Sequence, residues 1–149
     1  MTSAIEVYNP MSAYNSAINK LEKNGIRATK QRRVLAKLIF DNGKRHISAD
    51  NLFDEVKKEE RKISMATIYN TLKQFTNLGL IREIVVDQNK SLYCNNDQSH
   101  YHLYIEDEGK VIDIPTQNID LDIPSIPACL KLHDIDVIVR VRTLKDKNS

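Results

Sequence analysis

Residues 62–82 constrain the fold of this 149-residue chain more than any other segment, because they combine a capped helix, a glycine stop and a strand. Ser64 is a favoured N-cap residue, Gly79 is a favoured residue just past a helix C-terminus, and no glycine or proline lies between them. The apolar side chains of this stretch recur at helical spacing: Ile68, Leu72 and Phe75, flanked by Met65 and Leu78. The segment therefore predicts one amphipathic helix over 64–78.

The opposite face of this helix carries no carboxylate. It consists of small, amide, hydroxyl and lysine side chains: Ala66, Thr67, Tyr69, Asn70, Lys73 and Asn77. Asparagine can pair with two atoms of adenine, and tyrosine can pack on the thymine methyl group in the major groove. The face is thus suited to reading DNA. The alternative is an ordinary amphipathic helix with a solvated outer face.

The two halves of the chain differ in charge although the formal net charge is only +2. Residues 20–45 hold nine Lys/Arg against two acidic residues, whereas residues 95–136 hold nine Asp/Glu against two lysines. A charge run often marks no more than a solvated face. Together with the 64–78 helix, however, the basic block favours a first module that binds a polyanion and a second module with another task.

The first half predicts a winged helix-turn-helix, in which the last helix enters the major groove and a hairpin contacts the backbone. Its expected helices cover about 12–24, the stretch from the Thr29 cap to Phe40, the stretch from the Ser48 cap to Lys57, and 64–78. Its expected strands, joined by a polar turn, cover 80–86 and 91–94.

The second half predicts strands over 101–105, 109–114 and 134–142. A domain of about 50 residues has too small a core to be stable alone, so pairing with a second copy would supply the missing burial. We expect a homodimer with an α+β fold, in which a winged helix-turn-helix precedes a C-terminal α/β dimerisation domain. The expected parts are a flexible tail (1–14), the winged helix (15–95), a linker (96–99), the dimerisation and effector-binding domain (100–144) and a second tail (145–149).

A cluster of metal-ligating residue types lies around the boundary between the halves. His100 and His102 are two apart on an expected strand, so both imidazoles project to one side, and Asp113 on the next strand can face them. His46 and Cys94 could add ligands from the first half. An ion held by both modules would set their relative orientation. Exposed or hydrogen-bonded histidines remain the alternative, and the fourth histidine, His133, is expected to be structural.

Two cysteines cannot build a disulfide scaffold, no secretory signal precedes the first helix, and no run reaches the roughly 18 apolar residues of a membrane span. These features indicate a soluble cytoplasmic protein that does not enter the membrane.

Several motifs, in order and in register from about residue 15 to 142, resemble the ferric uptake regulator (Fur) family. They are residues 25–33, 46–52, 64–72, Gly79-Leu80 and His100-Tyr101-His102. The likeness is greatest to the iron response regulator (Irr) branch, because Asn70 follows Tyr69 where many members carry arginine, and because residues 113–115 and 136–142 resemble that branch.

The resemblance implies a homodimeric transcription regulator, of the repressor type, that responds to a divalent metal ion (Fe²⁺, Zn²⁺ or Mn²⁺) or to haem. By motif position, the interdomain metal site would comprise His46, Cys94, His100, His102 and Asp113, with Cys94 standing where a family carboxylate usually lies. The DNA-binding residues would be Arg27, Lys30, Ala66, Thr67, Tyr69, Asn70 and Lys73, on a palindromic, A·T-rich operator. Haem would be held by His100, Tyr101 and His102.

The departures from the family pattern narrow the expected chemistry. Ile105 and Glu108 stand at the first Cys-x-x-Cys pair, and no second pair follows, so we expect no structural zinc held by four cysteines. The effector remains open between iron or haem, zinc or manganese, and peroxide. A metal-dependent enzyme is a further alternative, but the chain has no Gly-rich phosphate loop and no nucleophile signature.

Overall fold

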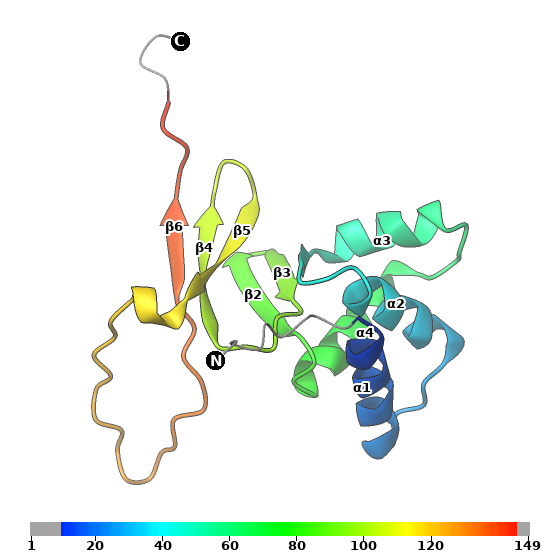
Figure 1. The fold of residues 1–149 in the computed structure, drawn as a ribbon, viewed down its shortest axis with the longest axis horizontal. Helices are drawn as coiled ribbons and strands as arrows, with labels where there is room; N and C mark the ends of the chain where they lie inside the picture. Colours follow the sequence, from blue (N-terminus) through cyan, green and yellow to red (C-terminus); the bar gives the residue numbers. More distant parts are fainter. Residues whose placement is uncertain (1–9, 146–149) are drawn as a thin grey trace, which may run out of the picture. The chain divides into compact units, whose positions relative to one another are not determined.

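The computed structural model describes residues 10–145, and the chain divides into two compact units, 1–97 and 98–149. The first unit contains these elements: α1 (Pro10–Lys23), α2 (Lys30–Phe40), β1 (His46–Ile47), α3 (Ala49–Lys58), α4 (Met65–Asn77), β2 (Arg82–Asp87) and β3 (Lys90–Cys94). The second contains β4 (His100–Ile105), β5 (Lys110–Pro115), the 3-10 helix η1 (Thr116–Asn118) and β6 (Ile138–Val141) (Figure 1).

Helices α2, α3 and α4 begin at the cap residues that the sequence predicts. The hydroxyls of Thr29, Ser48 and Ser64 accept hydrogen bonds from backbone amides three residues later, which satisfies a free donor of each first turn. After α4, Gly79 adopts a φ of +72°, a conformation that a residue with a Cβ rarely takes. The local signals for helix starts and for this stop are thus confirmed.

Helix α1 begins earlier than expected. Residues 10–14 are helical, so the prediction of a flexible tail over 1–14 is wrong for that stretch. Proline is tolerated in the first turn of a helix because the amide it lacks would have no partner there. Residues 1–9 and 146–149, where the tails were also predicted, lie outside the described residues.

The helices of the first unit enclose one hydrophobic core. Its fully buried side chains come from all four helices and from β1: Ala17, Leu21, Leu35, Ala36, Ile39, Ile47, Leu52, Val56, Ile68, Leu72 and Phe75. The burial of Ile68, Leu72 and Phe75 agrees with the apolar spacing predicted for the 64–78 helix. The core therefore holds α4 with its apolar side inward and leaves its polar side to solvent.

The predicted wing is a three-stranded antiparallel sheet in the order β1-β3-β2. The two-residue strand β1 escaped prediction because it is too short to show a pattern. Its pairing places His46 opposite Cys94 and Ile47 opposite Tyr93. The long-range pairing thus joins two of the predicted metal-ligating residues.

The second unit is built on a sheet in the order β5-β4-β6, with β4 antiparallel to β5 and parallel to β6. The last strand is shorter than the predicted 134–142, since only residues 138–141 pair with β4. Within residues 98–145 the helical contribution is the single 3-10 helix η1. The residues between η1 and β6, drawn in orange in Figure 1, form a long irregular segment in which His133 is exposed.

Candidate nucleic-acid interface and metal centre

The outer face of α4 has the arrangement that the sequence predicts. Ile68, Leu72 and Phe75 are fully buried, whereas Ala66, Tyr69, Asn70, Lys73 and Asn77 are exposed. Tyr69 is 53% exposed, a large aromatic side chain left open to a contact. Thr67 is half-buried, and its hydroxyl lies 2.9 Å from the hydroxyl of the cap residue Ser64. This face can therefore offer amide, phenol and ammonium groups to a partner.

Arg32 on α2 fixes α4 to the loop that carries Arg27. Its Nε donates to Oε1 of Gln74 on α4 (3.0 Å), and its Nη1 donates to the backbone carbonyl of Arg27 (2.7 Å). The side chains of Arg27 and Lys30 are exposed beside this link. Sequence reasoning missed the role of Arg32, because the hydrogen bond to Gln74 joins residues 42 positions apart.

Tyr93 on β3 is a buried phenol whose ionisation involves both the wing and α4. Burial, reinforced by the negative charge of Glu83 and by Tyr69, raises the pKa of Tyr93 to about 12. Desolvation disfavours the charged form of an acid, so Tyr93 stays neutral at any physiological pH. It therefore adds no negative charge behind the exposed face of α4.

In the second unit, two imidazoles and a carboxylate converge on one point. Nε2 of His100 lies 2.8 Å from Nε2 of His102, and Oδ1 of Asp113 lies 3.3 Å from the first and 3.6 Å from the second. The β4–β5 register places His102 directly opposite Asp113. His102 is only 4% exposed. The predicted grouping of these three residues is thus present in the structure.

The hydrogen bond at the far side of His100 orients its ring within this cluster. Its Nδ1 contacts the backbone carbonyl of Gln98, which can only accept, so the ring proton resides on Nδ1. Nε2 of His100 faces Nε2 of His102 and Oδ1 of Asp113. A proton shared between the two rings can occupy this space, and imidazole and carboxylate groups are also donors that divalent cations prefer. The donor set therefore fits a divalent cation, and the carbonyl of Gln98 orients the His100 ring from behind.

Tyr101 does not join this cluster. Side chains alternate along a strand, so Tyr101 lies on the opposite face of β4 from its neighbours His100 and His102. The three residues expected to hold haem are therefore not brought to one face.

The first unit contributes a second pair of ligand types, an imidazole and a thiol. His46 and Cys94 are cross-strand partners, and their ligand atoms lie within 4.8 Å of each other. Cys94 is buried and forms no disulfide, so its sulfur can serve as a thiolate ligand once deprotonated.

The buried amide of Asn95 ties the end of β3 to the body of the first unit. Its Nδ2 donates to the carbonyls of Ile39 and Gly43 (both 2.8 Å), and its Oδ1 accepts from the amide of Arg45 (2.7 Å). The guanidinium of Arg45 in turn donates to both carboxylate oxygens of Glu55 on α3 (2.6 and 3.3 Å). This network positions the residues adjacent to His46 and Cys94. No local signal in the sequence could have found it, because Asn95 stands next to the predicted linker.

The sequence profile of the ferric uptake regulator family matches residues 23–140. This chain belongs to the ferric uptake regulator family. Members of the family are metal-responsive transcription regulators rather than enzymes, so the family assignment argues against the alternative of a metal-dependent enzyme. Among the described residues, no helix has the length and apolar character needed to cross a bilayer.

Individual relatives agree with this assignment. The chain is 31% identical over 104 residues to the peroxide-responsive repressor PerR of Staphylococcus saprophyticus, a match that covers 70% of each chain. It superimposes on the ferric uptake regulator of Pseudomonas aeruginosa, solved with manganese, with a TM-score of 0.65 and 22% identity over 85% of this chain and 97% of that one. It superimposes on a zinc-bound manganese uptake regulator with a TM-score of 0.58 and 27% identity, covering 86% and 98% of the two chains.

These relatives support the Fur-family fold and a metal-dependent regulator in general. They include PerR and metal uptake regulators, so the finer likeness to the iron response regulator branch stays a prediction.

Proposed function

We propose that this Fur-family protein is a cytoplasmic, homodimeric transcription regulator that reads an operator with α4 and binds that operator according to the metal state of its histidine cluster. The observation that carries the proposal is the convergence of His100, His102 and Asp113 in a chain whose α4 exposes a carboxylate-free face. The two features supply an effector site and a reading surface.

Residues on α4 would contact base edges in the major groove. Asn70 can donate to and accept from adenine, Tyr69 can pack on thymine methyl groups, and Lys73 can neutralise a phosphate. Arg32 links α4 to the backbone of Arg27, which supports a role of Arg27 in backbone contacts, and Lys30 is exposed at the start of α2. Ala66 and Thr67 complete the surface and are small enough to let the helix approach the bases.

The test of this surface is selection of duplexes from a random-sequence library by the metal-loaded protein. The selected site, expected to be palindromic and A·T-rich, is then used to measure binding by the Tyr69→Ala and Asn70→Ala variants. Both variants should lose discrimination between the selected site and a scrambled duplex. Asn42→Ala, at an exposed asparagine on the loop after α2, serves as the matched control. Unchanged discrimination by both α4 variants would refute α4 as the reading helix.

The metal would be held by donors from both units, with His46 and Cys94 completing the set formed by His100, His102 and Asp113. Only five residues, 95–99, separate Cys94 from His100, which supports a shared site. Imidazole, thiolate and carboxylate donors suit Zn²⁺, Fe²⁺ and Mn²⁺, with the thiolate favouring zinc and iron over manganese. When bound, the ion would supply a positive charge between these donor atoms.

Metal analysis of purified variants tests this assignment. The His100→Ala/His102→Ala variant should lose stoichiometric metal, and Cys94→Ser should retain the ion with weaker affinity. His133→Ala, which removes an exposed histidine outside the cluster, should bind metal as the wild type does. Full loading of the double variant would place the metal elsewhere, and an unchanged affinity in Cys94→Ser would exclude Cys94 from the ligand set.

The likeness to PerR favours a second candidate function, peroxide sensing, beside regulation by iron or haem. A peroxide sensor would lose metal binding after metal-driven oxidation of a ligand histidine. Treating the iron-loaded protein with hydrogen peroxide and mapping added oxygen by peptide mass spectrometry tests this function. Oxygen on the peptide with His100 and His102, accompanied by release from DNA, supports it. Haem regulation instead requires a haem absorbance band that disappears in the His100→Ala/His102→Ala variant.

Exposed apolar side chains in the second unit support the proposed homodimer. Between η1 and β6 they are Leu121, Ile123, Ile126, Leu130 and Leu132. A run of exposed leucine and isoleucine side chains is costly in water and typical of a surface that a partner covers. Leu130, at 64% exposure, is the most exposed of the five. Sedimentation equilibrium should give a dimer for the wild type and a weaker dimer for Leu130→Asp.

A further inference from the structure

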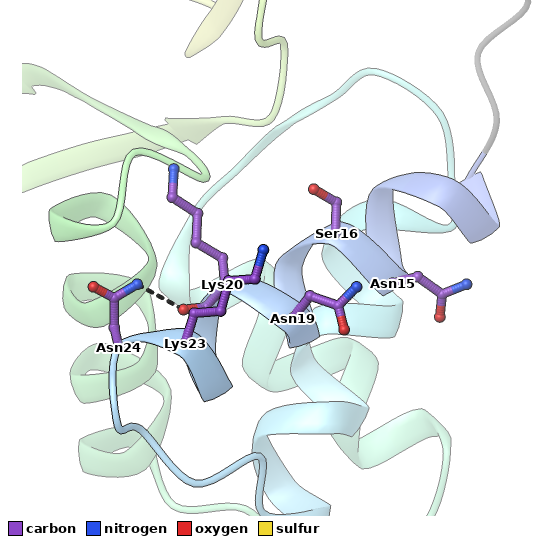
Figure 2. A pocket seen from close by; sticks show the side chains of 6 residues that line it. All are labelled: Asn15, Ser16, Asn19, Lys20, Lys23 and Asn24. Carbon is purple, nitrogen blue, oxygen red and sulfur yellow. Dashed lines mark hydrogen bonds between the residues drawn. The ribbon is translucent and has the colours of Figure 1, made fainter.

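Helix α1 has a polar face that the proposed reading by α4 does not use. Ala17, Ile18 and Leu21 bury one side of the helix in the core. The other side borders a shallow hollow of about 550 Å³, lined by six exposed residues: Asn15, Ser16, Asn19, Lys20, Lys23 and Asn24 (Figure 2). We call these six residues the α1 hollow.

The chemistry of the α1 hollow suits an anion. Two ammonium groups, three amides and one hydroxyl line it, so each of its six side chains can donate a hydrogen bond and none carries negative charge. Within residues 10–145, neither lysine forms an ion pair. The acidic residue of the last helical turns, Glu22, is paired with Arg33 on α2 at 3.5 Å. The positive charge of Lys20 and Lys23 is therefore available to a partner.

One residue of the α1 hollow, Lys20, reaches the end of α4. Nζ of Lys20 lies 3.9 Å from the position that a Cβ on Gly79 would occupy, and Gly79 is the second residue after the last residue of α4. A helix of 13 residues spans about 20 Å, so when its exposed face lies in the major groove, its end approaches a phosphate ridge. A basic surface at that end is placed to meet the sugar-phosphate backbone.

We propose that the α1 hollow binds the phosphate backbone of duplex DNA that flanks the base pairs read by α4. Lys20 and Lys23 neutralise phosphates, and the amides and the serine hydroxyl donate to phosphate oxygens. Contacts to phosphate carry no base information, so this surface sets affinity and orientation while α4 sets sequence preference. The inference rests on the proposed function, because it extends the DNA interface of α4.

Salt-dependent DNA binding by full-length, metal-loaded protein tests the inference. The probe is the duplex selected from the random library by the wild type, extended on both sides by unrelated sequence. Lys20→Gln/Lys23→Gln removes two charges per protomer, and glutamine is a good helix former that preserves α1. The matched control is Lys110→Gln/Lys131→Gln, which makes the same charge change in the second unit.

The logarithm of the DNA-binding constant falls linearly with the logarithm of the salt concentration. Each lysine–phosphate contact that is lost makes this slope less steep by about 0.9 on duplex DNA. The α1 variant should therefore lower the slope by about 1.8 for each bound protomer, with an unchanged ratio between selected and scrambled duplexes. In hydroxyl-radical footprinting of the selected duplex, the α1 variant should protect fewer nucleotides than the wild type at both outer ends of the protected region. Lys20→Arg/Lys23→Arg keeps the charge and should restore the slope.

The outcomes separate this inference from the proposed function. A slope equal to that of the control variant, with α4 variants still losing discrimination, would overturn the α1 contact alone. A wild type that selects no sequence would overturn the reading by α4. The fold of the α1 variant is verified by its helix signal in circular dichroism. If this folded variant no longer discriminates between selected and scrambled duplexes, and the salt dependence of its DNA binding is unchanged, the assignment of α1 to the DNA backbone is overturned.

Discussion

Replacing Asn95 with alanine removes the buried amide that closes the first unit at the end of β3. The side chain is 8% exposed and makes three hydrogen bonds, to the carbonyls of Ile39 and Gly43 and from the amide of Arg45. A hydrogen bond in a protein contributes about 1 kcal/mol net, and more when its removal leaves a buried partner unsatisfied. Asn95→Ala should therefore lower the free energy of unfolding by about 3 kcal/mol.

Urea unfolding of the full chain, followed by the helix signal in circular dichroism, measures this change. Within residues 10–145, all α-helices belong to the first unit, so the signal reports on that unit. A chelator in the buffer removes stabilisation by bound metal. With a slope of about 1.5 kcal/mol per molar urea, the midpoint should fall by about 2 M.

Asn42→Ala is the matched control, since this exposed asparagine donates one hydrogen bond, to the carbonyl of Leu38. Its midpoint should change by less than about 0.5 M, because exposed substitutions usually alter stability by under about 0.5 kcal/mol. If Asn95→Ala shifts the midpoint no further than this control, the network does not hold β3 to the first unit.

Three further outcomes follow from local geometry. Gly79→Ala should lower the stability of the first unit by about 1 kcal/mol in urea unfolding, because φ is +72° while the added Cβ meets only Nζ of Lys20, at an ordinary 3.9 Å; an unchanged midpoint would contradict the strain. The pKa of Tyr93 is raised from 10.0 to about 12, so the contribution of the neutral phenol to stability is complete below pH 10 and is lost as the pH rises through about 12. In a pH titration followed by tyrosinate absorbance, the step near pH 12 should be absent from the Tyr93→Phe variant. The hydrogen bond from Arg142 lowers the pKa of Glu106. This pair therefore stabilises the fold at pH values above the ordinary pKa of glutamate, and the stabilisation is lost as the pH falls through the lowered pKa. The pKa of the Glu106 carboxyl group, measured by nuclear magnetic resonance, should rise in the Arg142→Ala variant.

The elements that could be predicted are those whose signals are local. Each of the following depends on residues that are near one another in the sequence: the caps of α2, α3 and α4, the end of α4 at Gly79 and the β4–β5 hairpin. The candidate site was predictable to the same extent. His100 and His102 share a strand face by their spacing, and Asp113 follows in the paired strand, so a short hairpin brings the three together.

Sequence alone determined the order of the helices and of the strands other than β1, the polar face of α4 and the ligand types available to a metal, since each is written in the identity and spacing of neighbouring residues. Tertiary structure decided the rest. It paired the two-residue strand β1 with β3, buried Asn95 against residues 50 to 56 positions away, and brought Lys20 of the α1 hollow to the end of α4. These contacts depend on how the hydrophobic core brings distant segments together, and no periodicity within a single segment encodes them.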